Sequence, residues 1–187
     1  ASGMNKDEDP YLVHYYRINF DGKDMTCLTP ESAQHQAVFS DDYHYLVDTY
    51  SSVDRAPITV LRDARSGKLI KVLEKADISD ILAKGWKAPV VFKAKGRDGK
   101  TDMWGIIQRP SNFDPTKRYP VIEYIYAGPG DAYTPKSFIS YNWNTTSLAE
   151  LGFVVVQLDA MGTSWRGKKF EEVCYKNLKD AGFPDRE

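Results

Sequence analysis

One stretch, residues 119–130 (Y-P-V-I-E-Y-I-Y-A-G-P-G), constrains the fold of this chain more than any other. Its centre, residues 121–126, is rich in β-branched and aromatic side chains, which favours a strand. Pro120 precedes the run because proline cannot donate to the ladder of a central strand. Residues 127–130 (A-G-P-G) then predict a turn or loop. A short apolar strand that runs into a Gly/Pro loop is typical of the active-site edge of an open α/β sheet.

The last residue of this predicted strand is Tyr126. A phenol at the carboxyl end of a strand stands where open α/β sheets place their chemistry. Spacing alone allows a second interpretation, in which Tyr126 is a half-buried aromatic residue that closes the strand.

A second buried strand follows on the same pattern. Residues 153–158 are almost all apolar, which is typical of strands buried on both faces of a parallel sheet. Residues 143–151 predict a helix before it, ended by Gly152. Strand, helix and strand together predict a βαβ unit with a right-handed crossover.

The flanking segments extend this unit. Residues 90–95 and 103–109 predict a hairpin around the turn at 97–100. After the second buried strand we expect a helix over 169–179. A further helix is expected to begin at Phe183, with Pro184 in its first turn.

The first part of the chain shows a different pattern, of short strands separated by turns. We predict short strands there at 11–20, 25–28, 37–40, 43–50, 58–62 and 69–73. Turns about every ten residues without a long helix indicate an all-β unit, either one or two propeller blades or another antiparallel meander. Residues 77–84 predict a short helix that joins this unit to the next.

The charge distribution supports a division near Trp86. Residues 1–85 carry 10 Lys/Arg and 14 Asp/Glu, a net charge of −4, whereas residues 86–187 carry 15 and 12, a net charge of +3. The total of −1 gives no basic surplus of the kind that nucleic-acid binding requires. We therefore predict two domains, 1–85 and 86–187, and no nucleic-acid partner.

Several other features argue against further functions. There is no run of about 18 apolar residues, so we expect no membrane span. The three histidines, His14, His35 and His44, do not cluster with cysteines or carboxylates at ligand spacing. We therefore predict no metal site and no cofactor.

A hairpin followed by a βαβ unit resembles the opening half of an α/β-hydrolase. That fold carries its nucleophile in a later G-x-S-x-G elbow. The nearest match here, Gly162-Thr163-Ser164, lacks the second glycine, and the histidines all lie upstream. We therefore expect the catalytic Ser, Asp and His to be missing from this chain, which would stop before the nucleophile elbow.

Five short motifs make the resemblance specific. They are Asn112-Phe113-Asp114, Lys117-Arg118-Tyr119-Pro120, Tyr126-Ala127-Gly128-Pro129, Leu151-Gly152-Phe153-Val154-Val155, and Asp159 with Gly162-Thr163. With them the chain resembles the prolyl oligopeptidase family of serine peptidases, and within it the dipeptidyl peptidase IV-like group. The resemblance implies that residues 1–85 are the end of a β-propeller domain with a linker helix. It implies that residues 86–187 are the first part of an α/β-hydrolase (peptidase) domain. Met161 departs from the pattern, because many relatives have arginine there, and the loss of an ion pair is expected to affect the geometry of the loop.

The resemblance also implies an activity. It points to a serine exopeptidase that releases N-terminal dipeptides of the Xaa-Pro or Xaa-Ala type through an acyl-enzyme, in a periplasmic or secreted protein. Tyr126 would donate a hydrogen bond to the oxyanion, and the substrate would be a peptide. Two alternative functions are also compatible with the sequence. One is an acylaminoacyl peptidase or esterase of the same superfamily, and the other is a non-catalytic binding module.

The resemblance bears on assembly as well. In the fold it implies, the strand at 121–126 lies in mid-sheet, and its far neighbour comes after the nucleophile. Without that neighbour an apolar strand edge is left uncovered, and such edges recruit other strands. We therefore expect a homo-oligomer formed through this sheet edge.

Overall fold

A computed structural model describes residues 1–180 and 182–186 of the chain. The structure is mostly sheet, with a few short helices. It divides into two compact units, Ala1–Ile78 with Lys136–Phe138, and Ser79–Pro135 with Ile139–Glu187. This division falls a few residues before the boundary expected at 85/86, and the assignment of 1–85 and 86–187 to two domain types stays a prediction. In the described part of the chain, no helix is both long and apolar enough to cross a membrane.

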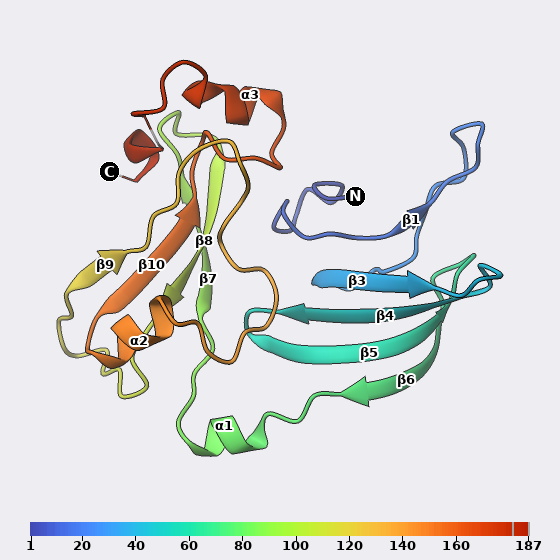
Figure 1. The fold of residues 1–187 in the computed structure, drawn as a ribbon, viewed down its shortest axis with the longest axis horizontal. Coiled ribbons are helices and arrows are strands. Elements are labelled where there is room, and N and C mark those ends of the chain that lie inside the picture. The colour runs from blue at the N-terminus through green and yellow to red at the C-terminus, as the bar shows by residue number, and fades with distance from the viewer. Residues whose placement is uncertain (181, 187) are drawn as a thin grey trace. The chain divides into compact units, whose positions relative to one another are not determined.

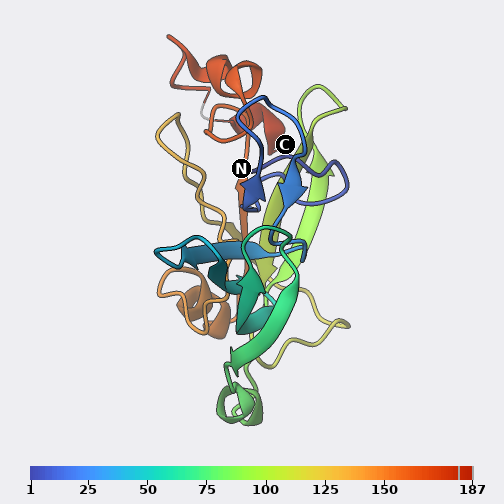
Figure 2. The ribbon, with the colours of Figure 1, turned by 90° about the vertical axis from the view of Figure 1, so that its right-hand side faces the viewer.

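The first unit is built on a four-stranded antiparallel meander (Figures 1 and 2). Its strands in spatial order are β3 (Gln34–Phe39), β4 (Tyr45–Ser52), β5 (Arg55–Asp63) and β6 (Leu69–Lys75). Leu28, Leu46 and Ala64 are buried together on this sheet, with Phe39 packed against them. The predicted rhythm of strand and turn is therefore confirmed for these four strands.

The long strand predicted over 11–20 is wrong. Only β1 (Tyr16–Arg17) forms, paired with β2 (Thr26–Cys27). The residues before β1 are instead fixed by single contacts. The Val13 N–H bonds the side chain of Gln34, and the Val13 carbonyl accepts from the N–H of His35. These bonds satisfy the backbone of Val13 without a continuous ladder.

The second unit contains a four-stranded mixed sheet (Figure 1). Its strands in spatial order are β7 (Val90–Lys95), β8 (Asp102–Gln108), β10 (Val154–Asp159) and β9 (Val121–Glu123). β8 runs antiparallel to both β7 and β10, whereas β9 and β10 are parallel. The crossover between the parallel strands contains α2 (Thr145–Glu150), and α1 (Ser79–Ala83) comes before β7. The predicted hairpin and βαβ unit are both present.

Close backbone packing in this sheet requires a glycine. A Cβ atom at Gly105 would lie 2.6 Å from the Gln157 carbonyl oxygen and 2.6 Å from the Phe92 ring. On the core side, Met103, Leu158, Ala160 and Phe170 form a buried apolar cluster. This cluster packs at the end of β10, and so supports the loop that follows it.

Two predicted elements in this unit are shorter than expected. β9 ends at Glu123, so Tyr126 lies three residues beyond the strand instead of on its last position. The helix expected over 169–179 is only α3 (Lys168–Glu171), followed by the 3-10 turn Glu172–Cys174. Lys176 adopts φ 57°, a left-handed conformation that cannot continue an α-helix. A 3-10 turn, Phe183–Asp185, stands where a helix was expected to begin.

Candidate functional site

The carboxyl ends of β9 and β10 define one edge of the sheet in the second unit, because these two strands are parallel. The loop after β9 carries Tyr126, Asp131 and Tyr133, and the loop after β10 carries Ser164 and Trp165. In open α/β sheets this edge is where ligands bind. This edge is therefore the candidate active-site rim.

Side chains join the two loops directly. The hydroxyl of Ser164 donates to the carbonyl of Pro129, and the indole N–H of Trp165 donates to Asp131 at 2.7 Å. The backbone N–H of Ser164 also reaches the carbonyl of Asp131, at 3.4 Å. The loop after β9 is therefore anchored on its neighbour.

Two buried side chains of β10 hold the far end of the same loop. The carboxylate of Asp159 accepts the N–H of Tyr133 at 2.7 Å and that of Thr134 at 3.1 Å. Gln157 donates from Nε2 to the carbonyl of Tyr133 at 2.8 Å. Asp159 is 1% exposed and Gln157 is 4% exposed. Burial makes these bonds costly to lose, so β10 fixes the backbone of Tyr133 at both its donor and its acceptor.

The two tyrosines of the loop meet face to face. Their ring centroids are 3.3 Å apart, with an angle of 29° between the ring planes. A hydrogen bond with the Tyr126 side chain, partial burial and the nearby charge of Asp131 raise the pKa of Tyr133 to about 12. Gly130 lies close to the Tyr126 hydroxyl, because a Cβ atom at Gly130 would be 3.0 Å from that oxygen.

Arg186 braces the backbone below this pair. Its guanidinium forms an ion pair with Glu123 at the end of β9, and it donates to the carbonyls of Tyr126 and Leu158. The cation thus joins the end of β9, the Tyr126 backbone and β10.

Met161, the departure from the family pattern, is well packed. Its side chain lies against the apolar cluster at the end of β10. Its backbone N–H donates to the carboxylate of Asp185 at 3.1 Å. The loop at Met161 is therefore held by packing and by a hydrogen bond from its own backbone.

We expected that no histidine would cluster with carboxylates, and for His35, in the first unit, this expectation is wrong. Glu31, His35 and Asp48 lie close enough for their ligand atoms to fall within 4.8 Å of one another, which their spacing in the sequence did not reveal. Arg62 occupies this cluster, with Nε 2.9 Å from Asp48 and Nη2 2.5 Å from Glu31. His35 lies 2.9 Å from Asp48 through Nδ1 and 2.8 Å from the Glu31 carbonyl through Nε2. The guanidinium already supplies the positive charge that a metal ion would bring, so the cluster is an ion-pair network.

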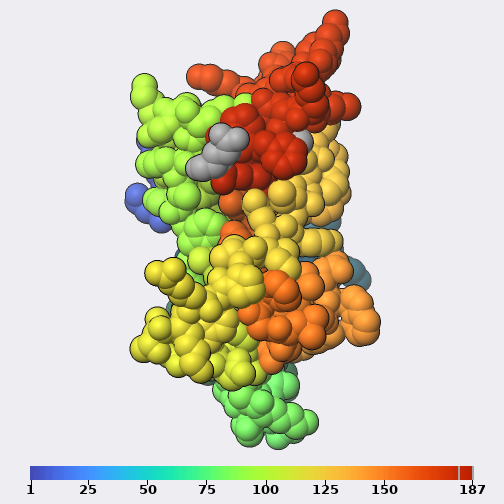
Figure 3. All heavy atoms as spheres, turned by 90° about the vertical axis from the view of Figure 1, so that its left-hand side faces the viewer, coloured from blue at the N-terminus to red at the C-terminus, as the bar shows by residue number. Residues whose placement is uncertain are grey.

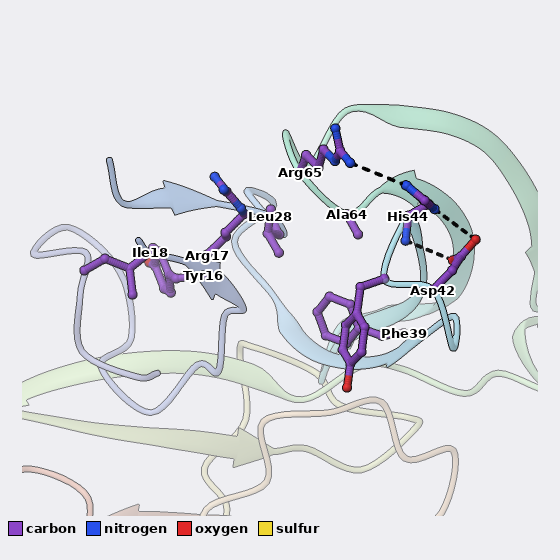
Figure 4. Close-up of a pocket in the computed structure, with 10 residues that line it drawn as sticks. Tyr16, Arg17, Ile18, Leu28, Phe39, Asp42, His44, Ala64 and Arg65 are labelled. Carbon is purple, nitrogen blue, oxygen red and sulfur yellow. Dashed lines mark hydrogen bonds and ion pairs between the residues drawn. The ribbon is translucent and has the colours of Figure 1, made fainter. Parts of the chain in front are cut away.

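A cavity of about 650 Å³ also lies in the first unit, lined by Arg17, Phe39, Asp42, His44 and Arg65 among others (Figure 4). Asp42 accepts from the hydroxyl of Ser40 and lies 2.9 Å from Nδ1 of His44. These bonds hold the pKa of Asp42 well below its usual range. The carboxylate stands between the serine and the histidine, which is the wrong order for a triad, where histidine must contact the nucleophile.

Family models match both ends of the chain. The model for the dipeptidyl peptidase IV N-terminal region matches residues 4–57, and the model for the prolyl oligopeptidase family matches residues 139–187. The curated relative named "Probable dipeptidyl-aminopeptidase B" from Arthroderma gypseum is 30% identical over 189 residues, covering 91% of this chain. The chain belongs to the dipeptidyl peptidase IV-like group of the prolyl oligopeptidase family.

Solved structures of this group share the fold. A protein described as a dipeptidyl aminopeptidase IV from Bacteroides ovatus matches with a TM-score of 0.76 and 28% identity, over 91% of this chain and 24% of that chain. Dipeptidyl peptidase 4 from Porphyromonas gingivalis matches with a TM-score of 0.72 and 26% identity, over 89% of this chain and 23% of that chain. A mouse relative named prolyl endopeptidase FAP is 30% identical, over 90% of this chain and 23% of its own length. The chain spans about a fifth of the length of the curated relatives it matches.

Of the residues at this rim, sequence reasoning singled out Tyr126 as a functional side chain, and its role as an oxyanion donor stays a prediction. Tyr133 and Asp131 were missed, because nothing local marks them. Gln157 carried a usable signal, since it is the one polar residue within the apolar run 153–158. A polar side chain in a buried strand needs a partner, and here that partner is the backbone of Tyr133.

Proposed function

We propose that the full-length protein containing this chain is a serine exopeptidase that releases N-terminal dipeptides, of the Xaa-Pro or Xaa-Ala type, by acyl-enzyme hydrolysis. In this proposal residues 1–85 are the end of a β-propeller, and residues 86–187 are the first part of an α/β-hydrolase domain. One observation carries the proposal: in a chain of this family, Tyr126 lies in the loop that follows β9, at the carboxyl edge of the parallel pair β9 and β10. Tyr126 is the oxyanion donor.

Acyl transfer explains why a hydroxyl at this position would matter. When a nucleophile attacks a peptide carbonyl, negative charge develops on the carbonyl oxygen. A hydroxyl that is already aimed at that oxygen stabilises the transition state without reorganising. The Tyr126 ring is stacked on Tyr133, and its backbone carbonyl accepts from Arg186, so its hydroxyl is held in place before a substrate arrives.

The order of the sheet agrees with this proposal. β7 and β8 form a hairpin, and β10 pairs antiparallel with β8. β9 and β10 are parallel and are joined through α2, so the loops after these two strands lie at one edge of the sheet. The nucleophilic serine, the acid and the histidine would come from other residues of the full-length protein. The serine would come from the nucleophile elbow, and the acid and the histidine from later parts of the chain.

A second candidate function is cleavage within a peptide chain. The observation that favours it is the mouse relative, whose name describes a prolyl endopeptidase. The two activities differ in one requirement. An enzyme that releases dipeptides recognises the free N-terminal amine, whereas an endopeptidase accepts a blocked one.

The test uses the full-length protein with two chromogenic substrates, Gly-Pro-p-nitroanilide and the same compound with a blocked amine. The proposal predicts fast release of p-nitroaniline from the first substrate only, and loss of that activity after treatment with a fluorophosphonate that labels active-site serines. Equal cleavage of the blocked substrate would favour the endopeptidase. Cleavage of neither substrate, together with no fluorophosphonate labelling, would contradict both.

A further inference from the structure

We infer that Tyr133 is a positioning residue that sets the direction of the Tyr126 hydroxyl. This inference rests on the proposed oxyanion role of Tyr126. It assigns Tyr133 a task in catalysis although this residue is 42% exposed and belongs to no strand.

The first step is steric. The ring of Tyr133 covers one face of the Tyr126 ring, with centroids 3.3 Å apart and planes inclined by 29°. A stacked ring cannot swing about its side-chain torsions unless its neighbour moves as well. The direction of the Tyr126 hydroxyl therefore depends on where Tyr133 stands.

The second step is the anchoring of Tyr133 itself. Gln157 and Asp159 are two residues apart on β10, so their side chains project from the same face of the strand. One bonds the carbonyl of Tyr133 and the other bonds its N–H. Both side chains are at least 96% buried, so the position of Tyr133 is set by the interior of the sheet.

The third step is the direction of the hydrogen bond between the two phenols. Each phenol has one proton to donate. If Tyr133 donates to the Tyr126 oxygen, the proton of Tyr126 stays free for the oxyanion of the substrate. The hydrogen bond with Tyr126 and partial burial raise the pKa of Tyr133 to about 12, so Tyr133 keeps its proton at the pH of a peptidase assay and has it to donate. A chain of two hydroxyls also polarises the terminal one, which strengthens its bond to an anion.

The test is a double-mutant cycle in the full-length enzyme, with Tyr126→Phe, Tyr133→Phe and the double variant. We expect Tyr133→Phe to lower kcat by about 3- to 10-fold with little change in KM, the effect of one hydrogen bond. In the Tyr126→Phe background, Tyr133→Phe should have no further effect, because the hydroxyl that it positions is gone. A merely structural role would not produce this dependence. Tyr141→Phe is the control, since the hydroxyl of that exposed tyrosine bonds Ser147 and its removal should leave kcat unchanged.

The possible outcomes distinguish the positioning role of Tyr133 from the oxyanion role of Tyr126. Tyr133→Phe keeps the stacked ring, so full kcat in this variant, beside a strongly impaired Tyr126→Phe, would overturn the role of the Tyr133 hydroxyl. Full kcat in Tyr133→Leu as well would overturn the role of its ring. Effects of Tyr126→Phe and Tyr133→Phe that multiply would also overturn the role of the Tyr133 hydroxyl. A Tyr126→Phe variant with full activity would remove the proposed oxyanion donor, and the role of Tyr133 with it. A thermal melt of each variant identifies any loss of kcat that comes from unfolding.

Discussion

The guanidinium of Arg97 binds the carboxylate of Asp185 from 88 residues away in the chain, with 3.0 Å from Nε to Oδ1 and 2.9 Å from Nη2 to Oδ2. The same guanidinium also pairs with Asp180. Arg97 lies in the turn between β7 and β8, so this ion pair joins the hairpin to the C-terminal turn, which lies beside it in Figure 3. The Asp185 side chain is fully buried and also accepts the N–H of Met161.

Removing this cation should destabilise the chain. Arg97→Met would leave the buried carboxylate of Asp185 without its positive partner, and we expect a loss of about 3 kcal/mol, the lower end for a broken buried pair because Arg97 is partly exposed. Lys95→Met is the matched control, since its exposed ammonium pairs with Asp102 on the surface and should cost under about 1 kcal/mol. Urea unfolding followed by tryptophan fluorescence measures both. Equal, small changes in the two variants would contradict the assignment.

Acid should weaken the same hairpin turn. The hydroxyl and N–H of Thr101, with the N–H of Lys100, lower the pKa of Asp98 to about 2, and Arg97 lowers the pKa of Asp180. A folded-state pKa below the ordinary value adds stability above about pH 4, and that stability is lost as the pH falls toward 2. The melting temperature of Asp98→Asn should therefore fall less between pH 4 and pH 2 than that of the parent chain. An identical pH dependence in both proteins would contradict this origin.

The chain on its own should hydrolyse no peptide. An oxyanion donor only assists an attack that a nucleophile must make, and we expect the nucleophile and its base to lie elsewhere in the full-length protein. Incubation of the purified chain with Gly-Pro-p-nitroanilide should release no p-nitroaniline above the buffer rate. Turnover that follows the protein through successive purification steps would overturn this prediction.

The chain should also associate through β9. In the described structure β9 pairs with β10 alone, and Val121 on this edge strand is 66% exposed. An uncovered apolar edge recruits another strand, so we expect dimers or larger species by light scattering at high concentration. Val121→Lys should shift the population toward monomer. Val47→Lys on the central strand β4 is the control and should not. A monomer at all concentrations before any substitution would contradict the prediction.

Local patterns predicted the strands well where the ladder is continuous. β7 forms at the predicted residues, Val90–Lys95, because the turn at 97–100 specifies a hairpin. Helical spacing at the C-terminal end was misleading. After α3 the Cys174 thiol donates to the carbonyl of Gly162, 12 residues away, and the left-handed backbone at Lys176 prevents the helix from resuming. Such long-range contacts leave no periodic trace in the sequence.

The candidate site was only partly predictable for the same reason. Tyr126 could be found because the Y-A-G-P motif marks it. Tyr133 stacks on that ring from 7 positions further along the chain. Gln157 and Asp159, which hold Tyr133, lie 31 and 33 positions beyond Tyr126. Only the folded sheet brings them together.

The most direct test of the account is the kcat of Tyr126→Phe in the full-length protein, measured on Gly-Pro-p-nitroanilide beside a thermal melt. This substitution removes one hydroxyl and keeps the stacked ring, and the loss of one oxyanion donor lowers kcat by roughly 10²–10³-fold. KM should change little, because contacts in the ground state survive. A well-folded Tyr126→Phe enzyme with kcat within about threefold of the parent would contradict the oxyanion role, since a packing residue contributes nothing that is specific to the transition state.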